Sequence, residues 1–284
     1  MLKSPAIPAM KDKGAEPYPS KRLGQHFLRD QRAIQRIIDA LDPHANETII
    51  EIGPGTGALT STLVERAGRV IAIEFDNKLT PLLTERFSDF PNFKLVMADA
   101  LTTDFCAEIL PARSARLVAN LPYNISTAIL QRLITQRACL DEMVLMLQRE
   151  VVERLLAPPG TTDRGYISVL VEAYCETEKL FDVAPGAFRP PPKVWSSVMR
   201  LKFRPHISTD LKDADLLWAT VSAGFAQKRK TILNNLRQAS GRLQEVLKRN
   251  GGASIVLCKA NVELQRRAET LTLEEWSRIV RSME

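Results

Sequence analysis

The sequence predicts an α/β protein with a mostly parallel sheet, followed by a small all-helical domain. Three observations lead to this prediction. Short apolar runs alternate with helical patterns between residues 48 and 156, which is typical of strand–helix–strand units. The strands are apolar on both faces, as in parallel sheets covered by helices. After about residue 210 the pattern is helical throughout.

The N-terminal half supplies most of the expected sheet. Residues 1–20 contain four prolines and few large apolar residues, so we expect a flexible tail. Asp30 is a candidate N-cap for an amphipathic helix that ends near Leu41, because apolar residues recur at helical spacing. The expected strands are 48–52, 69–73, 93–97, 117–119 and 143–147. The expected helices between and after them are 58–66, 77–87, 125–136 and about 148–156.

The pattern changes after the Pro-Pro-Gly sequence at 158–160. We expect two further strands at 167–174 and 198–203, with a Pro-rich loop between them. The expected C-terminal helices are 216–225, 229–236, 243–249 and 273–283. We therefore divide the chain into a tail at 1–20, an α/β domain at 21–204 and a helical domain at 205–284.

Composition excludes several classes of protein. A chain of 284 residues with 45% hydrophobic and 25% charged residues is neither mainly disordered, nor a fibre, nor a small disulfide scaffold. No apolar run approaches the roughly 18 residues of a membrane span. The N-terminus lacks the apolar core of a secretory signal. We therefore expect a cytoplasmic protein that does not contact membranes.

The cysteines Cys106, Cys139, Cys175 and Cys258 are widely separated. None of them forms a Cys-x-x-Cys pair, so no metal site is expected. Two disulfides are possible, but the scattered spacing in a long chain favours buried thiols. Free thiols agree with the reducing cytoplasm.

The net charge of +6 is unevenly distributed. Residues 1–36 hold 8 Lys/Arg and 3 Asp/Glu, residues 37–204 hold 18 and 21, and residues 205–284 hold 13 and 9. Basic charge at both ends favours a phosphate backbone as partner. Solvated helix faces are the alternative interpretation of the basic residues. The candidate contacts near the predicted C-terminal helices are Lys228, Arg229, Lys230, Arg237, Lys248 and Arg249.

A glycine-rich turn at 53–57 (Gly-Pro-Gly-Thr-Gly) follows a predicted strand and opens a predicted helix. Gly53 and Gly55 allow a tight turn and a close approach of the backbone to a ligand. The turn lacks the Lys-Ser/Thr of a P-loop, and Ala58 stands where a dinucleotide motif has its third glycine. A tight strand–helix connection without ligand is the alternative.

Two carboxylates follow the next two predicted strands. Glu74 lies 21 residues after Gly53, where a carboxylate accepts hydrogen bonds from both hydroxyls of a ribose in dinucleotide folds. Asp99 follows the third strand and could accept a hydrogen bond from an exocyclic amine such as that of adenine. A solvated strand end and a turn residue are the alternatives.

The sequence Asn120-Leu121-Pro122-Tyr123 ends the fourth predicted strand and is the most informative motif. Pro122 fixes its own φ and favours an extended Leu121, whose carbonyl can then point outward. Asn120 offers a second acceptor, and Tyr123 offers a stacking face. This arrangement is suited to holding a flat aromatic amine. A turn with a buried tyrosine is the alternative.

These motifs, in this order and spacing, resemble those of S-adenosylmethionine-dependent adenine-N6 methyltransferases, and most closely the small-subunit ribosomal RNA adenine dimethyltransferases. Three further motifs share the resemblance: Gln-His-Phe-Leu at 25–28, Phe-Arg-Pro-Pro-Pro-Lys-Val-Trp-Ser at 188–196 and Phe-Ala-Gln-Lys-Arg-Lys-Thr at 225–231. The resemblance covers about residues 20–280. His26 stands where many relatives carry Asn, and both side chains offer a hydrogen-bond donor.

The resemblance implies a Rossmann-like methyltransferase domain and a defined reaction. Methyl groups pass from S-adenosylmethionine to N6 of two adjacent adenosines in a hairpin loop near the 3′ end of small-subunit (16S) ribosomal RNA. The product is N6,N6-dimethyladenosine. The expected partner is a partly assembled 30S particle, with a role in small-subunit biogenesis.

The resemblance also implies roles for single residues. The oxygens of Asn120 and Leu121 would hold the amine, and Tyr123 and Phe188 would sandwich the extruded base. A dedicated general base is not expected. The residues implied in catalysis are Asn120, Leu121, Pro122, Tyr123 and Phe188. The residues implied in cofactor binding are His26, Leu28, Gly53, Gly55, Glu74, Asp99 and Asn120.

Three alternatives remain open. A nicotinamide-dependent dehydrogenase shares the glycine turn and the acidic residue but leaves the motif at 120–123 unexplained. The large-subunit ribosomal RNA methyltransferase of macrolide resistance typically has Ile where this chain has Leu121. A non-enzymatic assembly factor could keep the same fold. We expect a monomer, because no heptad pattern is present.

Overall fold

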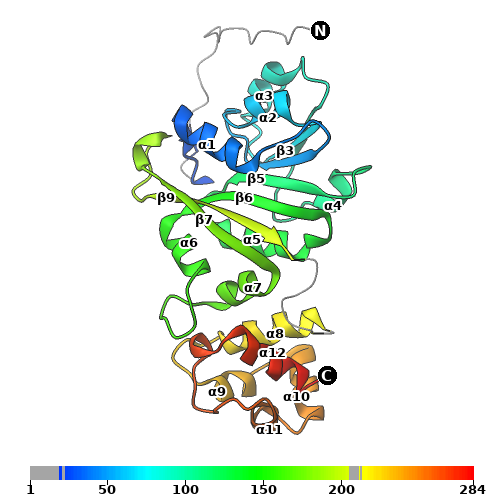
Figure 1. Ribbon diagram of the computed structural model, residues 1–284, viewed down its shortest axis with the longest axis vertical. Coiled ribbons are helices and arrows are strands. Elements are labelled where there is room, and N and C mark those ends of the chain that lie inside the picture. The colour runs from blue at the N-terminus through cyan, green and yellow to red at the C-terminus, as the bar shows by residue number, and fades with distance from the viewer. Residues whose placement is uncertain (1–18, 21–22, 205–210, 212) are drawn as a thin grey trace.

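The computed structural model describes residues 19–20, 23–204, 211 and 213–284 (Figure 1). A seven-stranded sheet with the order β4-β3-β2-β5-β6-β9-β7 forms its centre. The first five strands in this order, from β4 through β3, β2 and β5 to β6, run parallel to one another. Strand β9 is antiparallel to both of its neighbours, β6 and β7. The prediction of a mostly parallel α/β sheet is confirmed. The strands are β2 (Thr48–Ile52), β3 (Arg69–Glu74), β4 (Phe93–Met97), β5 (Ala115–Asn120), β6 (Leu140–Gln148), β7 (Cys175–Val183) and β9 (Ser196–Phe203).

Helices cover both faces of the sheet (Figure 1). Successive side chains of a strand point to opposite faces, so Ile49 and Val118 pack in one core while Ile50 and Leu117 pack in the other. Both faces of the strands are therefore buried, as their continuous apolar runs predicted. The helices of the first core are α1 (Gln31–Leu41), α2 (Thr60–Arg66) and α3 (Thr80–Phe87). Those of the second are α4 (Phe105–Glu108), α5 (Ser126–Thr135), α6 (Arg149–Leu155) and α7 (Tyr166–Tyr174).

The prediction of a strand at 167–174 is wrong, because this segment forms helix α7. Its apolar residues are buried all round, and such a run has neither the period of a strand nor that of an amphipathic helix. Gly165 starts the helix at its N-cap position, and Cys175 ends it in an extended conformation. The strand that completes this edge of the sheet is β7, which was not predicted and carries exposed charged residues along its first half.

The described chain from Ala214 onward is all helical (Figure 1). Three of the four predicted helices begin and end within two residues of their predicted limits. The fourth, predicted from 229, begins at Ile232, because Thr231 is its N-cap and accepts a hydrogen bond from the Asn234 amide. Helix α11 was not predicted. The helices are α8 (Ala214–Gly224), α9 (Ile232–Arg237), α10 (Gly241–Arg249), α11 (Ala253–Lys259) and α12 (Leu273–Arg281).

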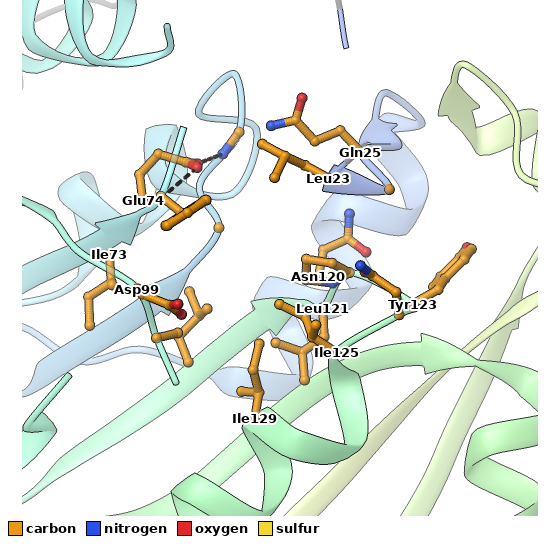
Figure 2. Close-up of a pocket in the computed structure, with 18 of the residues that line it drawn as sticks. Leu23, Gln25, Ile73, Glu74, Asp99, Asn120, Leu121, Tyr123, Ile125 and Ile129 are labelled. Carbon is orange, nitrogen blue, oxygen red and sulfur yellow. Dashed lines mark hydrogen bonds between the residues drawn. The ribbon is translucent and has the colours of Figure 1, made fainter. Parts of the chain in front are cut away.

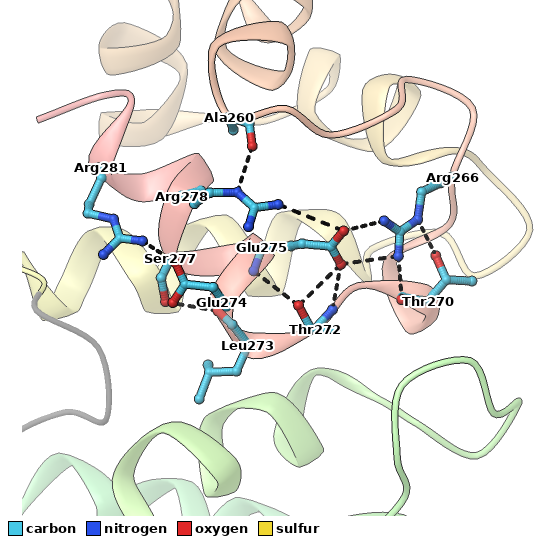
Figure 3. Close-up of polar contacts among 10 residues, drawn as sticks. All are labelled: Ala260, Arg266, Thr270, Thr272, Leu273, Glu274, Glu275, Ser277, Arg278 and Arg281. Atoms are coloured by element: carbon cyan, nitrogen blue, oxygen red, sulfur yellow. Dashed lines mark hydrogen bonds and ion pairs between the residues drawn. The ribbon is translucent and has the colours of Figure 1, made fainter.

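A polar network fixes the start of α12 to the loop before it (Figure 3). Glu275 accepts hydrogen bonds from the Thr272 amide at 2.8 Å and from the guanidinium of Arg266. Arg266 also donates to the Thr270 carbonyl at 2.6 Å. Because the Arg266 carbonyl accepts from the amide of Ile232 at 2.7 Å, the same arginine ties α12 to the start of α9.

The helical region packs against α7 and the loop before it. The Tyr174 hydroxyl donates to the carbonyl of Ala214 at 3.3 Å, and the Gly160 amide donates to the Glu269 carbonyl at 2.8 Å. Lys228 donates to the Thr162 carbonyl at 2.7 Å. These contacts join the two regions into one packed unit. The proposed boundary at 204/205 adjoins residues outside the described ranges and stays a prediction, as does the tail, of which only residues 19–20 are described.

Gly224 is required where α8 crosses α12. A Cβ at this position would lie 2.4 Å from the Cη2 atom of Trp276, whose side chain is fully buried. We expect Gly224→Ala to lower the free energy of unfolding by about 1–3 kcal/mol through overpacking. This is opposite in sign to the roughly 1 kcal/mol that alanine gains over glycine in a helix. Urea unfolding measures the effect.

The control for Gly224 is Gly186→Ala, because a Cβ at Gly186 meets nothing within 4 Å. We expect that variant to unfold within about 0.5 kcal/mol of the wild type. A Gly224→Ala protein as stable as this control would contradict the steric argument.

The expectation of four free thiols is wrong for two of them. Cys106 in α4 and Cys139 in the 3-10 turn η2 (Arg137–Cys139) form a disulfide. Cys175 is free and buried, and Cys258 is free and exposed. The two bonded cysteines are 33 residues apart in the sequence, and only the packing of α4 beside the end of α5 brings them together. Cysteine spacing therefore does not support the predicted cytoplasmic location.

From the sequence we expected neither a membrane span nor a metal site. No helix in the described ranges combines the length and the apolarity needed to cross a lipid bilayer. The same ranges hold no cluster of three or more metal-ligating side chains.

Candidate active site

A pocket of about 270 Å³ opens at the carboxyl ends of the parallel strands (Figure 2). Ligands of open α/β sheets bind at this edge. Five segments line the pocket: the chain before α1, the glycine turn after β2, the end of β3, the segment after β4 and the segment after β5. The motifs that the sequence placed at strand ends therefore meet in one cavity.

The glycine turn forms one wall of the pocket. Gly53 and Gly55 have φ of 69° and 58°, in the region that favours glycine. A Cβ at Gly55 would lie 3.0 Å from the ring of Phe27, so the turn lies against the chain before α1. Helix α2 begins only at Thr60, two residues later than predicted. The turn therefore contributes backbone to this wall, beside the ring of Phe27.

The two carboxylates lie on one side of the pocket, across from Asn120 and Tyr123 (Figure 2). Glu74 accepts hydrogen bonds from the amides of Phe75 at 2.9 Å and Asp76 at 2.8 Å. Burial raises the pKa of Glu74, and these hydrogen bonds oppose that effect. Asp99 accepts from the Leu101 amide at 2.9 Å. Glu74 also accepts from the Gly55 amide at 3.3 Å, so both carboxylates are held by backbone donors.

Asn120 has its amide orientation set by a backbone carbonyl. Its Nδ2 donates to the carbonyl of His26 at 3.1 Å. A carbonyl only accepts, so the NH₂ group must face His26 and the Oδ1 atom is turned away from it. Leu121 is anchored through its own amide, which donates to the carbonyl of Met146 at 3.1 Å. Within the described ranges, no donor reaches Asn120 Oδ1 or the Leu121 carbonyl.

Tyr123 stacks on His26, with ring centroids 5.5 Å apart. The Tyr123 hydroxyl hydrogen-bonds the Ser196 hydroxyl at 2.8 Å, and His26 Nδ1 hydrogen-bonds the Pro190 carbonyl at 2.7 Å. Because that carbonyl only accepts, Nδ1 carries the proton. Burial raises the pKa of Tyr123, so its phenol stays neutral. Both rings are thus held by the chain between Pro190 and the first residue of β9.

Phe188 and Leu28 do not line the pocket. They pair with each other across two short strands, β1 (Phe27–Leu28) and β8 (Phe188–Arg189), and each is about 4% exposed. The ring packed on Tyr123 is that of His26. Phe188 is not among the residues that line the pocket, and its contact with a base stays a prediction. Phe188 and Leu28 instead hold the chain before α1 against the Pro-rich loop.

Sequence reasoning missed several lining residues. Leu23, Gly24 and Gln25 line the pocket, and Gln25 donates to Asp76 at 3.0 Å. Phe75 also lines it and is 56% exposed. A large exposed aromatic directly after the predicted ribose carboxylate was a signal that the sequence contained. Leu23 and Gly24 gave no comparable signal, because only tertiary packing places them at the pocket.

Glu51 is a buried carboxyl behind the glycine turn. It is 1% exposed and accepts a hydrogen bond from the Thr60 hydroxyl at 2.6 Å. Burial raises the pKa of Glu51 to about 7, and the charge of Glu74 adds to this effect. The folded state therefore holds a proton that the unfolded state releases near pH 4.5. Stability is highest below that pH and falls as the pH rises through 7.

We expect Glu51→Gln to remove this pH dependence. The amide keeps the acceptor for Thr60 without a charge, so the variant should be more stable than the wild type at pH 8, by up to about 3 kcal/mol. The two proteins should be close in stability at pH 5. Urea unfolding at both pH values measures this, with Glu65→Gln on the exposed face of α2 as control. If the stability of Glu51→Gln fell with pH as steeply as that of the wild type, the assignment of this pH dependence to Glu51 would be contradicted.

The six candidate nucleic-acid contacts are all exposed. Lys228, Arg229 and Lys230 lie in the turn before α9, near the helix but not on it. Arg237 ends α9, and Lys248 and Arg249 end α10. Through its bond to Thr162, Lys228 places this turn beside the α/β region.

Known proteins resemble this chain over most of its length. The family model "ribosomal RNA adenine dimethylase" matches residues 19–280. The protein named ribosomal RNA small subunit methyltransferase A of Nitrosococcus oceani is 43% identical over 262 residues, 92% of this chain and 94% of that protein. The protein of the same name from Hahella chejuensis is 45% identical over 218 residues, 77% and 80% of the two chains.

Solved structures show the same fold. A dimethyladenosine transferase from Plasmodium falciparum superposes with a TM-score of 0.74 at 26% identity, covering 89% of this chain and 96% of that one. The 23S rRNA methyltransferase ErmE superposes with a TM-score of 0.64, also at 26% identity, covering 90% and 99%. Both similarities cover about nine-tenths of this chain.

Proposed function

Because the chain belongs to the ribosomal RNA adenine dimethylase family, we propose that it dimethylates N6 of two adjacent adenosines near the 3′ end of small-subunit (16S) ribosomal RNA. The target lies in a hairpin loop, and the product is N6,N6-dimethyladenosine. The observation that carries this proposal is the Asn120 Oδ1 atom at the edge of the pocket, which no donor among the described residues reaches. The family excludes the dehydrogenase alternative.

S-adenosylmethionine is the proposed methyl donor, and the residues of the pocket fit it. The glycine turn lines the cavity, and its Gly55 amide donates to Glu74. Glu74 suits the ribose hydroxyls and Asp99 suits the adenine amine, because carboxylates accept from both. His26, Gly53 and Asn120 complete the site. When bound, the cofactor supplies an electrophilic methyl group.

The chain's contribution to the reaction is to hold the target amine. Adenine N6 is a poor nucleophile, because its lone pair is delocalised into the ring. Asn120 Oδ1 and the Leu121 carbonyl accept from the two N6 hydrogens and orient the nitrogen toward the methyl group. As positive charge develops on N6, the same two oxygens stabilise it. The cationic product is strongly acidic, so its proton can pass to water without a protein base.

Tyr123 provides the stacking face for the extruded adenine. Its phenol and the ring of His26 are fixed by Ser196 and Pro190, so the face is preorganised. Pro122 restricts the backbone between Leu121 and Tyr123. Phe188 and Leu28 act as positioning residues that hold the chain before α1.

The proposed partner is small-subunit ribosomal RNA in a partly assembled 30S particle, bound by a monomer in the cytoplasm. Relatives named for the small subunit and the six exposed basic residues of the helical region support this partner. The likeness to ErmE makes large-subunit RNA the second candidate.

The deciding experiment offers tritiated S-adenosylmethionine with undermethylated small subunits and, separately, large subunits. Labelled nucleosides are identified by digestion and mass. We expect N6,N6-dimethyladenosine from the small subunit alone. Label in the large subunit would favour the second candidate. Cofactor binding without label in either would indicate an assembly protein and contradict the proposal.

A further inference from the structure

Trp195 is a half-exposed tryptophan close to the proposed active site. Its exposed fraction is 49%, whereas Trp276 is fully buried and Trp218 is partly buried. The neighbouring Val194 is also exposed, at 39%. No function described above uses either side chain. A large apolar ring that faces water costs free energy unless a partner covers it.

The sheet places Trp195 at the same edge as the pocket. Ser196, the next residue, pairs with Gln148 at the carboxyl end of β6. Asn120, at the carboxyl end of β5, pairs with Met146 of the same strand. The Ser196 hydroxyl hydrogen-bonds the hydroxyl of Tyr123 at 2.8 Å. Trp195 is therefore one residue from a direct contact with the tyrosine that faces the target base.

The backbone of Trp195 is held on both sides. Its carbonyl accepts a hydrogen bond from the amide of Arg149 at 2.9 Å, and Ser196 begins β9. The indole thus projects from a rigid segment. Ordering it on a ligand costs little conformational entropy, because only two side-chain torsions remain free.

The charges around Trp195 favour a nucleic acid over an apolar protein surface. Segment 188–195 contains two cations, Arg189 and Lys193, and no acidic residue. Both cations are exposed. Arg149 is a third exposed cation and pairs with Glu153 at 2.8 Å. An exposed aromatic ring flanked by cations is the combination that binds single-stranded RNA through its bases and phosphates.

We propose that Trp195 stacks on a nucleobase adjacent to the target adenosine. This inference rests on the proposed function. Extruding one adenine breaks its stacking with its neighbours in the loop. An indole carried by the segment that binds Tyr123 replaces one of those stacking contacts and holds the flanking nucleotide while the target enters. Because every base has a flat face, this contact fixes the position of the loop without reading its sequence.

The test compares Trp195→Ala, Trp195→Phe and the control Val194→Ala, using undermethylated small subunits and an RNA hairpin with two adjacent loop adenosines. Methyl transfer gives KM and kcat, and hairpin affinity is measured by fluorescence anisotropy. We expect Trp195→Ala to weaken hairpin binding and raise KM by about 5- to 150-fold. Trp195→Phe should stay within about threefold of the wild type, because phenylalanine still stacks. Val194→Ala should match the wild type.

Two further readouts separate stacking from other effects. Hairpin binding should quench the tryptophan fluorescence of the wild type, and Trp195→Phe should lose most of that quenching. The affinity for S-adenosylmethionine and the melting temperature should be unchanged in all variants. Wild-type hairpin affinity in Trp195→Ala would overturn the inference, as would a Trp195→Phe protein as weak as Trp195→Ala. If the wild type methylates neither RNA, the proposed function fails, while hairpin binding still decides the role of Trp195.

Discussion

Replacing Asn120 by alanine is expected to lower the rate of the first methyl transfer by about 10²- to 10³-fold, as for the loss of one preorganised group at a reacting atom. Asn120 Oδ1 has a set direction, because its Nδ2 is bonded to the His26 carbonyl. Removing the side chain leaves only the Leu121 carbonyl to orient the amine. The rate is measured in single turnover at saturating cofactor, so that any change in cofactor affinity does not enter.

The second methyl transfer should depend less on Asn120. A monomethylated N6 has one hydrogen and can make only one of the two contacts, so the Leu121 carbonyl alone can hold it. Single-turnover rates are compared on RNA that carries unmodified or monomethylated adenosine at the target position. Asn77→Ala, which removes an exposed amide outside the pocket lining, is the control. Equal losses on both substrates would contradict the two-acceptor arrangement.

Neutralising Arg229 and Lys230 together should weaken RNA binding and flatten its dependence on salt. Each phosphate contact contributes roughly 0.7–0.9 to the slope of log K against log salt, so two lost charges lower the slope by about 1.5. If the variant and the wild type bind RNA equally at 1 M salt, a slope lower by about 1.5 means that the variant binds about 30-fold more weakly at 0.1 M salt. We choose Arg229→Gln with Lys230→Gln and leave Lys228 in place, because Lys228 also binds the Thr162 carbonyl.

The matched control for this pair is Arg242→Gln with Arg281→Gln. These arginines belong to the same helical region but form ion pairs with Asp213 and Glu274. Both double variants lose two positive charges, so they have the same net charge. A similar change of slope in both would indicate a general effect of charge and contradict a contact surface at 229–230. An unchanged slope in the first pair would also contradict it.

Much of the site was predictable because its parts lie at the ends of parallel strands. Each of Glu74, Asp99 and Asn120 follows or ends a short apolar run that could be recognised as a strand. The carboxyl ends of parallel strands meet at one edge of the sheet. Local sequence was therefore enough to predict that these three residues, which span 46 positions of the chain, lie close together. All three line the same pocket.

Other features were not predictable for specific reasons. Helix α7 is apolar on every side because it is covered by both the sheet and the helical region, so its sequence lacks a period. The disulfide joins residues 33 positions apart through the packing of α4. The place of Phe188 depends on its pairing with Leu28, and two-residue strands leave no pattern in the sequence.

The sequence by itself determined the class of fold, the family and many of the residues that meet at the pocket. Each of these is encoded by local patterns: apolar periodicity, glycines in a turn, and polar residues at strand ends. Only the tertiary structure decided which way Asn120 points, that His26 and not Phe188 stacks on Tyr123, and where Trp195 meets solvent. These depend on contacts between segments as many as 164 residues apart, such as His26 with Pro190. Side-chain direction and burial arise from such contacts, which no local stretch of sequence contains.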